Sequence, residues 1–379
     1  MLLSQMPPAS IVNNAETFQE MLAHLKPQPD IAIDTESNSL YVYQERVCLI
    51  QISTAKNDYL IDTLVLPGLD ELAPLFANPA IQKVFHAGDY DLATLKRDYG
   101  FEFINVFDTM LAATALAEPS IGLAALLEKN LGVVMEKKYQ RADWGKRPLS
   151  SEMLLYAQSD SHYLLDLRDI LIKKLKDANR LDSVLEDSAA VARITLPMKE
   201  IEENIWKVRG AQDLNPMSLS LLKQLNHFRE DLARQRDVPP FKVFSDRVMT
   251  EIASTQPHFQ EELGLLPSLS PRFIKRYGSQ IMKVIQEWRK NPIPVKARKN
   301  NRPSDRELKL RDKLSNWRKA IGAKEKVPSN VVLPRDLLEL IAHHDPATKE
   351  ALEIVMRDYP YRFQRYGHQI FNVIKRRSQ

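Results

Sequence analysis

Residues 31–40 read IAIDTESNSL, an apolar, strand-like run that ends in a polar stretch with two carboxylates, Asp34 and Glu36. Successive side chains of a strand point to opposite faces, so positions i and i+2 share a face and these two carboxylates stand side by side. Negative charges at that separation repel each other. The pair therefore predicts a nearby cation and a functional site on this strand.

Short β-rich runs flank this stretch and alternate with helical segments as far as about residue 175. The strand-like runs are IAID, RVCLIQIST, DYLID and KVFH. Residues 89–100 and 150–175 carry apolar side chains at helical spacing, which predicts helices there. Strands that alternate with helices are typical of an α/β domain.

Charge is distributed unevenly over the 379 residues, although the net charge is only +4. Residues 1–205 carry 19 Lys and Arg against 30 Asp and Glu, whereas residues 206–379 carry 34 against 19. A basic half can simply be a solvated surface. It can also bind a polyanion, because Lys and Arg that neutralise phosphates release condensed counterions.

Cysteine content and hydropathy narrow the class of protein. Cys48 is the one cysteine, so no internal disulfide can form, and its apolar neighbours predict that it is buried. No run approaches the roughly 18 apolar residues of a membrane helix, and the start MLLSQMPPAS lacks the features of a signal peptide. These features favour a globular, cytoplasmic protein.

The second half of the chain has a different organisation. From residue 206 onward the strand-like runs end, and helices separated by Pro-bearing loops are expected. Residues 291–305 hold three prolines, many charges and almost nothing to bury, which predicts a linker. The predicted boundaries are 1–205 for an α/β domain, 206–291 and 304–379 for helical domains, and 292–303 for the linker.

The helical half repeats itself at an offset of 89 residues. RYGSQIMKVI at 276–285 matches RYGHQIFNVI at 365–374, and several other positions match in the same register. Two copies of one helical module are therefore expected. In the shared signature the Gly is expected at a turn and the Ile and Val positions on a core face. Arg276 and Arg365 are candidate nucleic-acid contacts, with a structural role as the alternative.

Further acidic residues lie at helix positions elsewhere in the first half. Asp91 follows a short β-rich run in HAGDYDLATL, and Asp160 lies on a predicted helix in YAQSD. Tyr156 precedes Asp160 by four residues, so the phenol and the carboxylate share one helical face. Each residue has a structural explanation when it is taken alone. As an ordered set with Asp34 and Glu36 they indicate a site.

This ordered set resembles the DEDDy-type exonucleases of the proofreading superfamily, which use four carboxylates and a tyrosine. Within the superfamily the chain is similar to the ribonuclease D family, on the motifs LIQIST, FHAGDYDL, FDTMLAA, IGLAALLEKNLG and KKYQRADWGKRPLSSEMLLYAQSD. The repeated module resembles the helicase-and-ribonuclease-D C-terminal (HRDC) domain. The resemblance covers nearly the whole chain, and all five motif positions are filled.

The resemblance implies a two-metal-ion site for phosphodiester hydrolysis. Oxygen ligands suit Mg²⁺ or Mn²⁺, and such a metal pair stabilises charge on the attacking and leaving oxygens. By this resemblance Asp34 bridges both ions, Glu36 and Asp160 help to hold one ion, and Asp91 supports the other. Tyr156 orients the attacking water by hydrogen bonding, since a phenol with a pKa near 10 is a poor base at neutral pH.

Residues 137–149, KKYQRADWGKRPL, form a basic segment just before the Tyr156 helix. Trp144 is a candidate for stacking on a base or sugar, and Lys138 and Arg147 for contacts with phosphates. The alternative is that Trp144 and Pro148 pin the segment to the body of the domain.

The predicted architecture is an RNase H-like α/β exonuclease domain, a mixed sheet flanked by helices, followed by two all-α HRDC-type domains. The resemblance implies a 3′-5′ exoribonuclease that releases 5′-mononucleotides, with structured RNA such as tRNA precursors as substrate. A DNA 3′-5′ exonuclease of the same superfamily and a non-catalytic nucleic-acid-binding protein are the alternatives. Neither a membrane nor an obligatory protein partner is expected.

Overall fold

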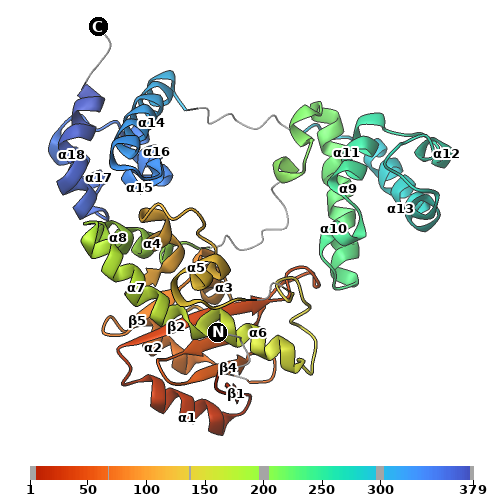
Figure 1. Cartoon of the computed structure of the whole chain (residues 1–379). Coiled ribbons are helices and arrows are strands. Elements are labelled where there is room, and N and C mark those ends of the chain that lie inside the picture. The colour runs from red at the N-terminus through yellow and green to blue at the C-terminus, as the bar shows by residue number, and fades with distance from the viewer. Residues whose placement is uncertain (1–5, 67, 136–137, 196–204, 296–302, 376–379) are drawn as a thin grey trace. The chain divides into compact units, whose positions relative to one another are not determined.

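The computed structural model describes all residues except 1–5, 67, 136–137, 196–204, 296–302 and 376–379 (Figure 1). These residues form two compact units. The first comprises residues 1–37, 47–196 and 302–379, and the second comprises residues 38–46 and 197–301. Most of the predicted linker 292–303 lies outside the described residues. None of the helices in the described ranges has the length and hydrophobicity to cross a bilayer.

A six-stranded mixed sheet forms the centre of the first unit. Its strands are β1 (Ser10–Val12), β2 (Asp30–Ser37), β3 (Val47–Ser53), β4 (Asp58–Asp62), β5 (Gln82–Phe85) and β6 (Val106–Asp108). Their spatial order is β1-β4-β3-β2-β5-β6. Strands β2, β3 and β4 pair antiparallel, whereas β1 with β4, and β5 with β2 and β6, pair parallel. This is the predicted RNase H-like arrangement.

Helices cover both faces of this sheet. They are α1 (Ala15–Leu25), η2 (Asp70–Leu72), α2 (Ala73–Ala77), α3 (Asp89–Tyr99), α4 (Thr109–Ala115), α5 (Leu123–Leu131), α6 (Ser151–His162), α7 (Leu164–Asp177) and α8 (Leu181–Val191). Ile31 and Ile33 of β2 pack with α1 and α3 on one face, whereas Ala32 packs with α4, α5 and α7 on the other. Because both faces are covered, every residue of β3 is buried.

The long helix expected over residues 150–175 is two helices, because the chain breaks at Tyr163. The two parts pack on different strands. Tyr156 and Ala157 of α6 join a cluster with residues of β3 and β4, whereas α7 joins the cluster of β2, β5 and β6. One straight helix would not follow both parts of a twisted sheet.

The second helical module belongs to the first unit. Its helices are α14 (Asp305–Glu325), α15 (Ser329–Val332), α16 (Arg335–His344), α17 (Lys349–Val355) and α18 (Pro360–Lys375). Helix α18 contacts α8 through Arg362, whose side chain is fully buried and pairs with Glu186 at 3.0 Å and Asp187 at 2.8 Å. Arg362 also donates to the carbonyl of Val331 in its own module at 3.0 Å. This arginine therefore joins the helical module to the α/β domain.

The first helical module forms most of the second unit. Its elements are η3 (Ile205–Lys207), η4 (Ala211–Asp213), α9 (Pro216–Gln235), α10 (Pro240–Val243), α11 (Asp246–Thr255), α12 (Gln260–Leu263) and α13 (Pro271–Lys290). No strand occurs after residue 206 in the described residues, as expected. The core combines apolar residues of α9, α11 and α13.

The two modules share hydrogen bonds as well as sequence. Arg229 donates to the carbonyl of Phe244 at 3.3 Å, and Arg318 donates to that of Leu333 at 2.9 Å, 89 residues later in both cases. The expectation that the signature Gly marks a turn is wrong, because Gly278 lies inside α13 and its counterpart inside α18. A Cβ at Gly278 would lie 3.2 Å from the Ile274 side chain, so any other residue there would have to push this neighbour aside by a few tenths of an ångström.

Candidate active site

Strand β2 presents Asp34 and Glu36 on the sheet face that also carries Ala32. Asp34 lies opposite Gln51 of β3 and Glu36 lies opposite Leu49, and the regular pairing ends with a bulge after Glu36. Both carboxylates are half-buried. The alternation inferred from the sequence is therefore present, and the two side chains leave the same face.

Polar contacts fix helix α6 on this face. The Ser161 hydroxyl meets that of Ser53 on β3 at 2.7 Å. Gln158 Nε2 donates to Asp58 Oδ2 on β4 at 2.6 Å, and His162 Nδ1 lies 2.8 Å from the same oxygen. Residues 158, 161 and 162 lie on the side of the helix toward β3 and β4. Their bonds set the register of α6 over the sheet.

With α6 in this register, Asp160 meets the carboxylates of β2. One carboxylate oxygen from each of Asp34, Glu36 and Asp160 lies within 4.8 Å of the others. The Tyr156 hydroxyl hydrogen-bonds to Asp160, one helical turn away. The ring of Tyr156 is 7% exposed and packs against Trp144 at 6.2 Å between centroids. Four of the five predicted residues are thus brought together.

Asp91 reaches the group from the first turn of α3. The Thr35 hydroxyl, between the two β2 carboxylates in sequence, donates a short hydrogen bond to Asp91 Oδ1. Asp91 lies outside the group of three close oxygens, but its charge raises the pKa of Asp34, Glu36 and Asp160. The fifth predicted residue therefore borders the same site.

The turn before α3 is held by Asp108, a buried residue at the end of β6. Its carboxylate accepts hydrogen bonds from the backbone N–H groups of Ala87 and Gly88 at 3.3 and 2.9 Å. It also accepts from Met110 and Leu111 at 2.8 and 3.1 Å, as the N-cap of α4. One carboxylate thus ties β6 to the start of the helix that carries Asp91.

Burial and mutual repulsion raise the pKa of every carboxyl in the site. Burial is the main cause, and it raises the pKa of Glu36 to about 9, of Asp160 to about 7 and of Asp91 to about 6. Burial and the charges of its three neighbours raise the pKa of Asp34 well above its usual value. Burial also raises the pKa of Tyr156, so its phenol remains a neutral hydrogen-bond donor.

The donor set of this site fits a divalent metal. It consists of carboxylate oxygens, the ligands that hard cations prefer. No Lys or Arg within the described ranges forms an ion pair with any of the four carboxylates. Close, half-buried acids without a basic partner are suited to bind a cation.

Comparison with known families agrees with this geometry. Residues 9–176 match the family model described as 3'-5' exonuclease, and residues 218–285 and 307–374 each match the HRDC domain. The chain therefore contains a domain of the 3′-5′ exonuclease family at residues 9–176. It carries two HRDC domains in addition, and both matches fall inside the helical domains predicted from the repeat. The ribonuclease D-type interpretation is therefore confirmed.

Relatives of the chain include proteins that are named as exonucleases. The exosome complex exonuclease RRP6 of Saccharomyces cerevisiae is 37% identical over 262 residues, which cover 65% of this chain and 36% of that protein. The structure of the RRP6 catalytic core from Trypanosoma brucei is 29% identical, with a TM-score of 0.65 over 76% of this chain and 81% of that one. Escherichia coli RNase D, at 22% identity and a TM-score of 0.70, covers 93% of this chain and 100% of that one and shows the shared fold.

The curated relatives are longer than this chain. The chain spans about a third to a half of the length of the curated relatives that it matches. Several of those relatives are named as exosome components. The expectation that this exonuclease needs no obligatory protein partner therefore stays a prediction.

The residues proposed for substrate contacts before α6 differ in exposure. Trp144 is 1% exposed, and Arg147 forms two 2.6 Å hydrogen bonds with Asp62 and another with the Trp144 carbonyl at 2.8 Å. This arrangement favours the alternative in which the segment is pinned to the domain. Lys138 is exposed and lies 5.0 Å from the centre of the Tyr139 ring.

The two arginines of the repeated signature have different surroundings. Arg276 is exposed and lies 5.3 Å from the centre of the Tyr277 ring. Arg365 pairs with Glu325 at 3.0 Å and donates to the Asn179 carbonyl of the α/β domain at 3.2 Å. The surroundings leave Arg276 available for a ligand, whereas Arg365 contributes to contacts inside the protein.

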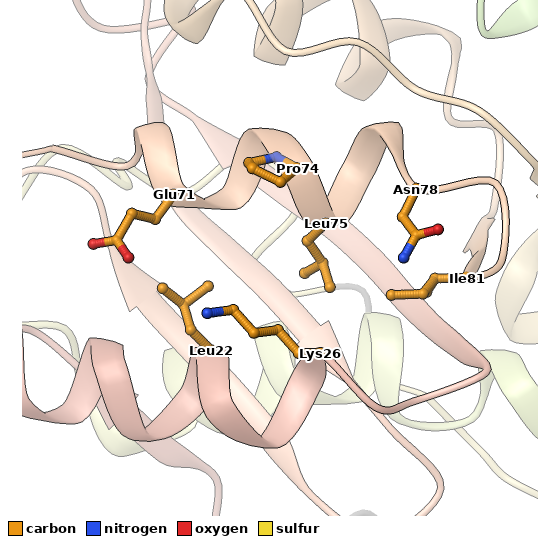
Figure 2. A pocket seen from close by; sticks show the side chains of 7 residues that line it. All are labelled: Leu22, Lys26, Glu71, Pro74, Leu75, Asn78 and Ile81. Atoms are coloured by element: carbon orange, nitrogen blue, oxygen red, sulfur yellow. The ribbon is translucent and has the colours of Figure 1, made fainter.

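A pocket of roughly 440 Å³ lies apart from the acidic residues, between α1 and the η2–α2 segment (Figure 2). Its lining is mainly apolar, with one lysine and one glutamate: Leu22, Lys26, Glu71, Pro74, Leu75, Asn78 and Ile81. None of these residues belongs to the carboxylate site. The pocket therefore does not change the assignment of the site.

Sequence reasoning missed the residues that orient the predicted ones. Asp58, Gln158 and His162 lie far apart in sequence, and only the register of α6 over β4 brings them together. Thr35 lies inside the motif itself, but a hydroxyl between two acids has no distinctive pattern. The Asp108 cap was detectable in principle, since Asp directly before a helical segment is a common N-cap signal.

Proposed function

We propose that this exonuclease is a metal-dependent 3′-5′ exoribonuclease that releases 5′-mononucleotides. The observation that supports the proposal is the approach of Asp34, Glu36 and Asp160 to within 4.8 Å, with Tyr156 bonded to Asp160. The resemblance to ribonuclease D supplies the direction of hydrolysis and the product.

We infer that the site takes two divalent cations, either Mg²⁺ or Mn²⁺. Asp34, Glu36 and Asp160 would hold the cations, together with Asp91. When bound, the ions would stabilise the charge of the attacking and leaving oxygens. The carboxylates contribute by being ionised and held in place, which the bonds from Thr35 and Tyr156 support.

Tyr156 acts as a positioning donor in this proposal. Burial and three neighbouring carboxylates raise the pKa of its phenol, so it does not lose its proton near neutral pH. A neutral hydroxyl close to Asp160 can orient an attacking water by hydrogen bonding. Tyr156→Phe is therefore expected to lower kcat with little effect on RNA binding, and an unchanged kcat would reduce the residue to a packing role.

The proposed substrate is structured RNA with a free 3′ end, such as a tRNA precursor. The support is the resemblance to ribonuclease D together with relatives named as RRP6 exonucleases. The basic helical half would bind the body of such an RNA through its phosphates. On α13 the exposed side chains of Arg272, Lys275, Arg276 and Lys283 follow one another at helical spacing. We call these four residues the basic stripe.

We also propose a cytoplasmic location. The support is chemical, because Cys48 is the one cysteine of the chain and is fully buried, so the fold depends on no disulfide. Fractionation of cells that carry a tagged full-length chain would test the location. Enrichment in any other compartment would contradict it.

Digestion of RNA labelled at its 5′ end, with Mg²⁺, with Mn²⁺ and with EDTA, tests the function. The proposal expects a ladder that shortens from the 3′ end only when a divalent cation is present. A matched DNA oligomer separates the alternatives, because equal or faster hydrolysis of DNA would identify a DNA exonuclease. Binding without hydrolysis under every cation would leave a non-catalytic RNA-binding protein.

A further inference from the structure

Gln51 on β3 lies next to the carboxylate site but has no role in the function described so far. In the antiparallel ladder Gln51 pairs directly with Asp34. Directly opposed residues leave the same face of a sheet, with Cβ atoms about 4.5–5.5 Å apart. The Gln51 side chain therefore points from the same face as Asp34, beneath helix α6.

The carboxamide of Gln51 is buried without a hydrogen-bond partner. The residue is 0% exposed, and neither its Oε1 nor its Nε2 has a partner among the described residues. On the side away from Asp34, Gln51 pairs with Leu60 of β4, whose apolar side chain offers none. Burying an amide in this way costs free energy, so an apolar side chain of similar size would suit the fold better.

Most polar side chains between β3, β4 and α6 do have partners. Ser53 is two residues further along β3 on the same face, and its hydroxyl meets that of Ser161. Gln158, the buried glutamine of α6, donates to Asp58 at 2.6 Å and to the Pro7 carbonyl at 2.7 Å. Ser53, Ser161 and Gln158 therefore have partners, and of Asp58 only Oδ1 lacks one, whereas neither polar atom of the Gln51 carboxamide has a partner.

We propose that Gln51 is a positioning residue of the active site, whose carboxamide N–H holds the ionised carboxylate of Asp34 in its cation-binding orientation. The inference rests on the proposed function, since it requires a cation at this site. A primary amide has two N–H donors and a carbonyl acceptor, and an ionised carboxylate accepts several hydrogen bonds. Residues that hydrogen-bond to metal ligands in this way set both the orientation and the affinity of a site.

Gln51→Met tests the inference first in the metal-free protein. Methionine has nearly the same length and shape but no amide, so the variant removes only the unsatisfied polar atoms. The melting temperature without metal is expected to stay the same or to rise. Gln158→Met is the matched control, and its melting temperature is expected to fall because that amide has partners. A fall of equal size in both variants would show that Gln51 is an ordinary structural residue.

Titration of the same full-length variants with Mn²⁺, followed by calorimetry, tests the link to the cation. Gln51→Met is expected to bind Mn²⁺ more weakly by about 10-fold, the lower end of the effect of removing a hydrogen-bond partner of a metal ligand. A smaller rise in melting temperature on adding Mn²⁺ should accompany the loss. Unchanged Mn²⁺ affinity would overturn the inference while leaving the proposed function intact, provided that the wild-type protein binds the ion.

Gln51→Glu gives a second, independent measurement if the methionine variant does not fold. A carboxylate in place of the amide adds a negative charge beside Asp34. The variant is expected to be less stable without metal and to bind Mn²⁺ more tightly, because like charges gain most from a cation between them. Affinity equal to that of the wild type would place Gln51 outside the site and overturn the inference. Failure of the wild type to bind Mn²⁺ would overturn it together with the proposed cofactor.

Discussion

Two groups of buried carboxylates in the first unit differ in what balances their charge. Glu186 and Asp187 on α8 face the fully buried guanidinium of Arg362. The carboxylates around Asp34 face no Lys or Arg of the described residues at ion-pair distance. Burial raises the pKa of Glu186 as it does that of Glu36, but at Glu186 the arginine acts against burial. Arg362 thus balances the charge of the first group, whereas the second group needs a bound cation to balance its charge.

The basic stripe on α13 shows the opposite situation, because it has exposed cations and no acidic partner. No ion pair within the described residues includes Arg272, Lys275, Arg276 or Lys283. The corresponding residues of α18, 89 positions later, are Tyr361, Gln364, Arg365 and Asn372. Helix α18 is therefore less basic on this face and contacts the α/β domain, whereas the four cations of α13 are exposed. The difference suggests that repeated modules of one fold have acquired separate tasks.

The largest expected effect is the loss of the internal cation. Arg362→Ala removes the cation that faces Glu186 and Asp187, and breaking such a buried ion pair costs about 3–5 kcal/mol. The free energy of unfolding of the first unit, measured by urea denaturation, should fall by that amount. Arg365→Ala is the control on the same helix, and its partly exposed pair with Glu325 should cost about 0–1 kcal/mol. Equal losses in both variants would contradict the role given to Arg362.

A smaller effect is expected from Asp34→Asn in the carboxylate site, which has no basic partner among the described residues. Removing the carboxylate that approaches both Glu36 and Asp160 should lower kcat/KM on an RNA oligomer about 10²–10³-fold, the range for losing one electrostatic contact to a transition state. The same change should raise the metal-free melting temperature, because it relieves repulsion. Asp89→Asn, an exposed acid in the same turn of α3 as Asp91, serves as the control with unchanged kcat/KM. Retained activity in Asp34→Asn would remove the site assignment.

The carboxylate site should also make the stability of the metal-free protein depend on pH. Because the pKa of Glu36 is about 9 in the fold and 4.5 in a free side chain, the folded state holds more protons between these values. Metal-free stability should therefore fall as pH rises through this window, by at most about 1.4 kcal/mol per pH unit. Glu36→Gln should flatten the dependence, and so should saturating Mg²⁺. If wild type and Glu36→Gln had identical melting curves across this pH window, the fold would not raise the pKa of Glu36.

Much of the site could be predicted from the sequence because its signals are local or ordered. Asp34 and Glu36 are two residues apart on one strand, and Tyr156 and Asp160 are four apart on one helix, so each pair shares a face. The repeat likewise follows from matched residues at a constant offset. Helix and strand positions were predictable for the same reason, because the apolar residues that face the core recur at the spacing of a helix or a strand.

Contacts between distant segments could not be predicted in this way. The sequence left open whether Trp144 is pinned to the domain, and it does not indicate that Tyr156 is the partner of Trp144 or that Arg147 pairs with Asp62. These contacts depend on how α6 and the segment before it settle on the sheet. Arg362 has Phe273 as its counterpart in the first module, so the repeat contains no sign of the ion pairs that Arg362 forms. The surface on which a module docks depends on residues of the neighbouring domain, and the sequence pattern of the module gives no information about those residues.

The smallest expected effect concerns the basic stripe, where phosphates would supply the missing anions. Replacing Arg272, Arg276 and Lys283 by Gln should weaken RNA binding. The slope of log K against log[salt] should become shallower by about 0.7 for each phosphate of a single-stranded RNA that the variant no longer neutralises. Arg234→Gln with Lys290→Gln is the control in the same unit, because these cations already pair with Asp231 and Glu287. Cations that already pair with acids neutralise fewer phosphates of the RNA, so binding through them releases fewer counterions. Replacing them should therefore change the slope less. If both sets of replacements changed the salt slope equally for each charge removed, the whole helical half would act as a diffuse positive surface. The sequence difference between α13 and α18 would then not correspond to a difference in RNA binding.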